Sequence, residues 1–130
     1  MLMPCEVAVK SVVPAIKATL AKELIEMHGL RQQEVASLLG VTQAAVSQYA
    51  RSVRGGALRI EKDNETRMLT MEIVTLLAND RLPPMELAIK FCELCRTVRS
   101  KRLMCRLHRR LEPSLDIQKC TVCLSSSRRP

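Results

Sequence analysis

Five cysteines in the C-terminal half of the sequence have a spacing that suits metal binding. They follow the pattern C-x2-C-x9-C-x14-C-x2-C and are Cys92, Cys95, Cys105, Cys120 and Cys123. Two intervening residues on a helix or knuckle bring both sulfurs of a C-x2-C pair to one metal ion. The two pairs are 24 residues apart, which is more than zinc ribbons usually have. The spacing predicts a metal site with sulfur ligands.

A tetrahedral zinc ion and an iron–sulfur cluster each need four ligands, so one of the five cysteines is in excess. The fifth could be a spare, a resolving thiol or a ligand that exchanges. The long spacing and the extra cysteine favour an iron–sulfur cluster, of the [4Fe–4S] type, over zinc. A structural zinc site stays the alternative, and the sequence does not tell which four cysteines are ligands.

The positions of these cysteines on their expected helices argue against a purely apolar role. A cysteine that only fills the core should lie in the apolar stripe of its helix. Cys92 and Cys95 instead lie on one edge of their stripe, and Cys105 shares a face with arginines. Two other groups are expected outside the site: Cys5, near a helix start, is expected to pack, and His108 is expected to be solvated.

Positive charge is concentrated around the cysteines. The net charge is +8, but residues 1–95 hold 11 Lys and Arg against 11 Asp and Glu, and residues 96–130 hold 10 against two. Such a basic segment can contact a polyanion, form a solubilising face or balance a negative centre nearby. Arginines beside cysteines favour thiolates, so a metal–thiolate centre also explains the segment.

Apolar residues recur with helical spacing along the chain, and no strand-like alternation is present. We expect helices over 4–13, 15–27, 32–39, 43–52, 64–79, from Pro84 to a break near Ser100, and over 103–111. Their expected apolar stripes are Ile16, Leu20, Leu24 and Met27; Leu69, Ile73, Leu76 and Leu77; Leu87, Phe91, Leu94 and Val98; and Leu103, Leu107 and Leu111. The sequence therefore predicts an all-α fold.

Residues 31–54, RQQEVASLLGVTQAAVSQYARSVR, have the residue types that two closely crossing helices require. Ala36 is small enough for close packing, Gly40 tolerates a left-handed turn, and Thr42 can cap the second helix. The apolar residues that would hold the second helix in place are Val35, Leu39, Val41, Val46 and Tyr49. The segment predicts a helical hairpin that either reads DNA or binds a protein.

The stretch QEVASLLGVTQAAVSQY resembles the helix-turn-helix of phage-repressor-like (XRE, Cro and cI type) transcriptional regulators, particularly their archaeal branch. The resemblance covers residues 15–54. It implies a sequence-specific regulator of double-stranded DNA whose second helix lies in the major groove. The likeness to archaeal regulators adds to the preference for an iron–sulfur cluster.

Matched to this motif, the DNA-facing positions are Arg31, Thr42, Gln43, Ala44, Ser47, Gln48, Arg51 and Arg54. Glutamine can bond to adenine through two hydrogen bonds, so Gln43 and Gln48 are expected at base edges. Ser47 and the arginines are expected at phosphates, as is Arg59 beyond the helix.

One position departs from the family pattern. The family commonly has Ser or Thr before the first helix of the motif, whereas this chain has Arg31, which cannot cap it. The lost cap should weaken that helix by ~0.5 to 2 kcal/mol, unless Arg31 offsets this by binding a DNA phosphate.

Several other functions fit the sequence less well. Only Tyr49 and Phe91 are aromatic, too few for a protein that stacks single-stranded bases. There is no carboxylate or Ser/His constellation and no Gly-rich phosphate loop, so neither an enzyme nor a small-molecule substrate is expected. The N-terminus is a poor signal peptide, and no apolar run approaches the ~18 residues of a membrane span. We expect a cytoplasmic protein without membrane contact.

These observations predict a helix-turn-helix DNA-binding domain in residues 1–58, a helical dimerisation and cysteine module in 59–123 and a disordered tail in 124–130. The protein is expected to be a homodimeric regulator that senses redox state or iron, with the helix over 64–79 at its dimer interface. Two alternatives stay open. One is a regulator with structural zinc and no sensing, and the other is an electron-transfer or assembly protein whose hairpin binds a protein.

Overall fold

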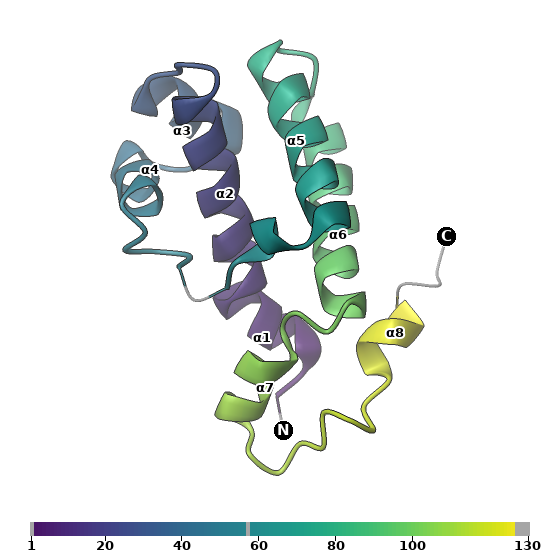
Figure 1. Ribbon diagram of the computed structural model, residues 1–130. Helices are drawn as coiled ribbons and strands as arrows, with labels where there is room; N and C mark the ends of the chain where they lie inside the picture. The colour runs from purple at the N-terminus through teal and green to yellow at the C-terminus, as the bar shows by residue number, and fades with distance from the viewer. Residues whose placement is uncertain (1, 57, 127–130) are drawn as a thin grey trace.

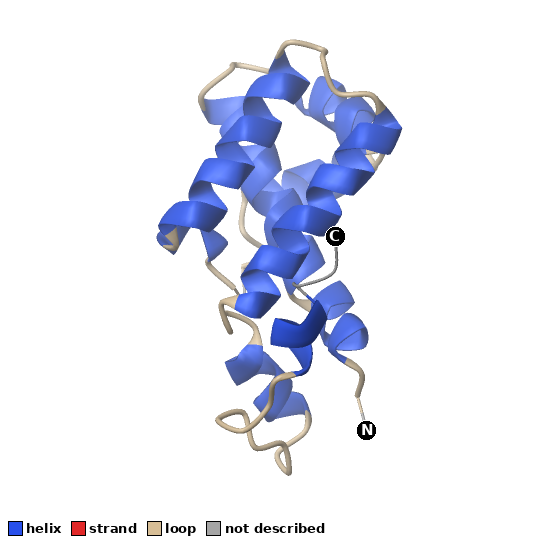
Figure 2. Cartoon of the chain, turned by 90° about the vertical axis from the view of Figure 1, so that its right-hand side faces the viewer, coloured by secondary structure: helices blue, strands red, loops and turns tan. Residues whose placement is uncertain are grey.

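The computed structural model describes residues 2–56 and 58–126, and these residues form an all-helical fold, as the apolar periodicity predicts (Figure 1, Figure 2). In chain order the elements are α1 (Pro4–Lys10), α2 (Val12–Glu26), α3 (Gln32–Leu39), α4 (Gln43–Ala50), the short 3-10 helix η1 (Ile60–Lys62), α5 (Asn64–Ala78), α6 (Pro84–Ser100), α7 (Cys105–Leu111) and α8 (Val122–Ser126). Within these described segments, no helix combines the length and the apolar character that a bilayer crossing requires.

Helix α2 lies at the centre of the molecule, with α3 and α4 on one side and α5 and α6 on the other (Figure 1). Its buried residues are Val12, Ala15, Ile16, Ala18, Leu20, Ala21 and Leu24. The three alanines widen the buried face beyond the predicted leucine and isoleucine stripe and let neighbouring helices approach closely. Met27, expected in that stripe, is exposed because α2 ends at Glu26.

In α5 the buried face differs from the predicted stripe. The buried residues are Thr66, Thr70, Ile73, Val74 and Leu77, whereas Leu69 and Leu76 are only partly buried. The two threonines can be buried because their hydroxyls are paired. Thr70 Oγ1 donates to the Thr66 carbonyl oxygen at 2.7 Å, and Thr66 Oγ1 donates to the Asp63 carboxylate at 2.9 Å.

Helix α7 is held against the N-terminal segment by a buried histidine. His108 Nε2 lies 3.2 Å from the Leu2 carbonyl oxygen and 3.4 Å from Glu112 Oε2, and the Leu2 N–H donates to the same carboxylate at 3.3 Å. The prediction that His108 is solvated was therefore wrong. Leu111, predicted for the apolar stripe, is exposed instead.

Helix α8 has no counterpart among the helices expected from the sequence. It includes residues 124–126, which we expected in the disordered tail, while residues 127–130 of that predicted tail lie outside the described residues. A helix of five residues is too short to show an apolar repeat. Helix α8 packs against α6, and Cys123 lies against the core.

Asp63, which caps α5 and contacts Lys101 just after α6, allows a test of how these two helices are stabilised. Asp63 Oδ2 accepts a hydrogen bond from the Thr66 backbone N–H at 2.9 Å and lies 3.1 Å from Lys101 Nζ. The bond from the Thr66 N–H, together with the Lys101 ammonium, lowers the pKa of Asp63. Asp63→Ala should therefore lower the free energy of unfolding by about 0.5–2 kcal/mol at neutral pH, measured by chemical denaturation.

The pH dependence of this contribution has a definite sign. Because the pKa is lower in the folded state, the contribution is present above the ordinary Asp pKa of 3.8 and disappears as the pH falls through the folded-state value. Asp63→Asn keeps a capping oxygen without the charge, so it should lose less than Asp63→Ala and show a weaker pH dependence. Equal losses for the two variants at neutral pH would contradict the capping role.

Candidate nucleic-acid interface and thiol site

Helices α3 and α4 form a hairpin that packs against α2 (Figure 1). Gly40 ends α3 with a φ of +65°, and the Val41 N–H donates to the Ala36 carbonyl oxygen at 3.0 Å across the turn. The Thr42 hydroxyl oxygen accepts a hydrogen bond from the Ala45 N–H at 3.1 Å and so caps α4. The turn residue and the cap predicted from the sequence are both present.

Helix α4 has an apolar inner face and a polar outer face. The inner face consists of Ala45, Val46 and Tyr49, all buried. The outer face presents Gln43, Ala44, Ser47, Gln48 and Arg51, of which Ser47 and Gln48 are half-buried. The polar side chains expected at DNA therefore lie opposite the face that holds the hairpin to α2.

Two arginines at the end of α4 are positioned by contacts within the hairpin. The Arg54 guanidinium lies 5.7 Å from the centre of the Tyr49 ring, within cation–π range. The backbone N–H of Arg54 donates to the Gln48 carbonyl oxygen at 3.3 Å. Arg51 Nε donates to the Ser47 carbonyl oxygen at 3.4 Å. Both positive charges are thus held close to the C-terminal end of α4.

Arg31 precedes α3 and makes no capping hydrogen bond with its side chain. Glu34 compensates in part, because its Oε1 accepts hydrogen bonds from Arg31 Nε at 3.0 Å and from the Arg31 backbone N–H at 3.3 Å. These bonds, the side-chain one foremost, lower the pKa of Glu34. One half of a capping box therefore replaces the missing N-cap.

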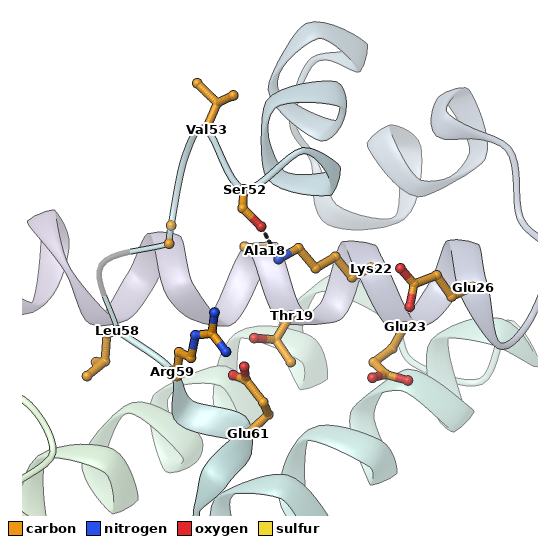
Figure 3. A pocket seen from close by; sticks show the side chains of 12 residues that line it. Ala18, Thr19, Lys22, Glu23, Glu26, Ser52, Val53, Leu58, Arg59 and Glu61 are labelled. Atoms are coloured by element: carbon orange, nitrogen blue, oxygen red, sulfur yellow. Dashed lines mark hydrogen bonds between the residues drawn. The ribbon is translucent and has the colours of Figure 1, made fainter.

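Arg59 lies in a groove of about 500 Å³ between α2 and residues 52–61 (Figure 3). Lys22 Nζ donates to Ser52 Oγ across this groove and ties the end of α4 to α2. The two cations share the groove with three carboxylates, those of Glu23, Glu26 and Glu61. This mixture of charges does not favour a phosphate, so Arg59 is less suited to DNA contact than the arginines of the hairpin.

Four of the five predicted cysteine ligands gather around Arg99 and Arg102. Helices α7 and α8, which carry two of them, lie with α1 at the end of the molecule away from the hairpin (Figure 1). Cys105, Cys120 and Cys123 line one small cavity together with Arg99 and Arg102. Cys95 joins them through Arg99, which forms hydrogen bonds to both Cys95 and Cys123.

Cys92 has different surroundings from the other four cysteines, although it still acts electrostatically on Cys95, one turn further along α6. It is exposed and lines a separate apolar groove of about 410 Å³, in which Leu38 and Leu39 of α3 face Phe91 of α6. The groove lies between α3 of the hairpin and α6.

Burial raises the pKa of Cys95 and of Cys105. At Cys95 the Arg99 guanidinium opposes this effect, and at Cys105 Arg102 opposes it while the neighbouring Cys123 and Cys120 thiols add to it. Over the described residues, no three Cys, His, Asp or Glu side chains are grouped closely enough to hold a metal ion.

Reasoning from the sequence missed one member of the thiol site, because Cys5 was expected to pack. Arg99 was expected near the cysteines, but only as one of several basic residues around them. The structure places Cys5 on the surface, with Arg99 Nη1 3.9 Å from its Sγ. No spacing rule connects residues so distant in sequence, and only the fold brings them together.

Comparison with known proteins does not identify a family. No protein-family model matches the chain, and no curated protein or solved structure is significantly similar to it. Function must therefore be inferred from the residues of the chain itself.

Two glycines that frame α4 should respond differently to substitution. Gly40 has a positive φ, but an added Cβ would meet no atom within 4 Å, so Gly40→Ala should lose only the cost of the left-handed conformation, about 1–2 kcal/mol. Gly55 has a φ of +76°, and an added Cβ would lie 2.3 Å from the Pro14 carbonyl oxygen. Gly55→Ala should therefore destabilise the protein more, because the backbone must move.

Chemical denaturation of the two variants measures this difference. Gly40→Asn is the matched control, because asparagine tolerates the left-handed region and should lose less stability than alanine. If Gly55→Ala were no more destabilising than Gly40→Ala, this result would contradict the close packing of residue 55 against the Pro14 carbonyl of α2.

Proposed function

We propose that this protein is a sequence-specific transcriptional regulator of double-stranded DNA, with α3 and α4 as its helix-turn-helix. We also propose that its C-terminal cysteines hold an iron–sulfur cluster that senses redox state or iron. The observation that carries the proposal is the hairpin: a left-handed glycine turn, a capped second helix and a polar outer face. The resemblance of the same residues to phage-repressor-like regulators supports it.

Helix α4 offers side chains that can read base edges in the major groove. Gln43 is exposed in the first turn, and recognition helices contact bases mainly with their N-terminal residues. Its amide can donate and accept at adenine, and Ala44 beside it can contact a thymine methyl group. Gln48 is half-buried and lies further along the helix, so Gln43 is the principal base-reading residue in this proposal.

Arginines at both ends of the hairpin would fix its position on the duplex. Arg31 lies at the start of α3, and Arg51 and Arg54 follow α4. Contacts to phosphates set register and orientation but carry no sequence information. The contacts of Arg51 and Arg54 with Ser47 and Tyr49 reduce the freedom that these side chains would lose on binding.

The cysteine site fits a thiolate-bound metal by the chemistry of its donors. Sulfur is the ligand that both zinc and iron–sulfur clusters favour, and the candidate ligands are Cys92, Cys95, Cys105, Cys120 and Cys123. The Arg99 guanidinium already lies beside two of these sulfurs, those of Cys95 and Cys123, so their surroundings suit a cation. An iron–sulfur cluster bound there would supply a redox-active and iron-dependent centre.

A structural zinc ion is the second candidate for this site. Helices α7 and α8 have seven and five residues, and such short helices need support beyond their own packing. A zinc ion held by thiolates from several elements would provide that support without any sensing.

The exposed face of α5 is the proposed dimer interface. Met68 is 71% exposed and lines a shallow surface with Met71 and Leu76. Exposed methionines of this kind mark surfaces that pair with a partner. A two-fold dimer would present two copies of α4 to successive half-sites.

DNA reading by Gln43 can be tested once the preferred duplex has been selected from random sequences. Gln43→Ala should lower discrimination at one base pair by ~1–3 kcal/mol. Arg51→Ala should instead weaken binding to all sequences alike. It should also reduce the slope of log affinity against log salt concentration by about one, because one counterion fewer is released on binding. Fluorescence anisotropy over a range of salt concentrations measures both effects.

The matched control for Arg51→Ala is Arg110→Ala, because Arg110 is exposed on α7 at the end of the molecule away from the hairpin (Figure 1). Equal loss of affinity for selected and random DNA in Gln43→Ala would contradict base reading. A wild-type protein with no salt-dependent affinity for DNA would contradict the regulator and leave a hairpin that binds protein.

The proposed dimer interface can be tested by introducing a charge on the exposed face of α5. Met68→Lys should raise the dimer dissociation constant at least tenfold, because two like charges would face each other across a two-fold axis. Met27→Lys, at a similarly exposed methionine just after α2, should leave the dimer unchanged. Sedimentation equilibrium measures the constants, and a wild-type protein that stays monomeric on DNA would exclude this interface.

A further inference from the structure

Cys5 has a fixed position on the surface, near the thiol site. It lies in the first turn of α1 and is exposed, while Val7, on the opposite face of the helix, is buried. Helix α1 contacts α7, and the Leu2 N–H before it donates to Glu112 just after α7. Because α1 contacts α7 and the residue before it bonds to Glu112, the position of Cys5 relative to α7 is fixed.

Arg99 joins Cys5 to two other cysteines. Its Nη1 lies 3.9 Å from Cys5 Sγ, and the guanidinium also hydrogen-bonds to the thiols of Cys95 and Cys123. These three cysteines belong to α1, α6 and α8. Three sulfurs from three helices therefore surround one positive group.

Sulfur atoms are the polar neighbours of Arg99. Its Nε is buried and has no hydrogen-bond partner among the described residues. The guanidinium contacts Cys5, Cys95 and Cys123, so a centre formed by these sulfurs would lie beside a fixed positive charge.

We propose that Cys5 is a ligand of the metal centre and shares it with Cys95 and Cys123, so that the centre ties α1 to α6 and α8. The inference rests on the proposed function, namely that the cysteines hold a metal. The remaining ligand would come from the other cysteines, Cys92, Cys105 or Cys120.

The charges around the site suit such a centre. Four thiolates around zinc, or around an oxidised [4Fe–4S] cluster, leave a net charge of about −2. Arg99 lies among Cys5, Cys95 and Cys123, and Arg102 lies beside Cys105. These two guanidinium groups would neutralise the centre locally.

Metal content distinguishes this arrangement from one that uses only C-terminal cysteines. The full chain is purified without oxygen and loaded in separate samples with ferrous iron plus sulfide, or with zinc. Cys5→Ser should lower the affinity for the metal that the wild type binds by at least tenfold, because a ligand is lost. Val9→Ser, an equally exposed position on α1, is the matched control and should bind metal like the wild type.

A second measurement on the unaltered chain guards against a folding defect in the variant. Alkylation with iodoacetamide, read residue by residue by mass spectrometry, should show Cys5 protected in the metal-loaded protein and modified in the metal-free protein. A wild type that binds neither iron nor zinc would overturn the metal site itself. A wild type that binds metal, with Cys5→Ser binding equally well and Cys5 still alkylated, would overturn only the role of Cys5.

Discussion

The burial of α2 is the constraint on which the rest of the structure depends. Ile16, Leu20 and Leu24 are fully buried, and small residues between them let helices pack on more than one side. The hairpin of α3 and α4 and the pair of α5 and α6 therefore share this one helix as their support. Helix α1 continues the same support, since only Ser11 separates it from α2 and the Ser11 hydroxyl donates to the Val7 carbonyl oxygen at 2.7 Å. Hairpin and thiol site are thus both positioned relative to a single packed helix.

Helices α1 to α7 could be predicted to within a few residues because their limits are set by local chemistry. Pro84 opens α6, Asp63 caps α5 and Gly40 ends α3, and each acts through its own backbone conformation or hydrogen bonds. The buried faces were harder to predict, because burial depends on partners distant in the sequence. Thr70 is buried although the predicted stripe contained Leu69 instead, and it can be buried because its hydroxyl is satisfied within its own helix.

The candidate sites differ in predictability for the same reason. The polar face of α4 follows from helical periodicity within eight residues, and the resemblance to phage-repressor-like regulators indicates which residues are expected at DNA. The thiol site depends on contacts such as that between Arg99 and Cys5, which are 94 residues apart. The C-x2-C spacing at Cys92 and Cys95 predicts a paired ligand set, and on helix α6 it places the two thiols within one turn, close enough for Cys92 to act on the pKa of Cys95. The spacing does not reveal that Cys92 also lines the groove beside α3 or that Cys95 contacts Arg99.

If the thiol site regulates DNA binding, the packing of α2 limits the route by which it does so. A metal can change the DNA affinity only to the extent that it binds two conformations with different affinity, and typical couplings are about 1–3 kcal/mol. Moving the hairpin through α2 would disturb several fully buried side chains, each worth roughly 1.5–3 kcal/mol, which is more than such a coupling supplies. Shifting α6 relative to α5 near the short helices α7 and α8 disturbs less buried surface, because α6 has only Leu94 and Val98 fully buried. These energies therefore favour regulation through the geometry of a dimer formed by α5, in which the structure of the hairpin itself does not change.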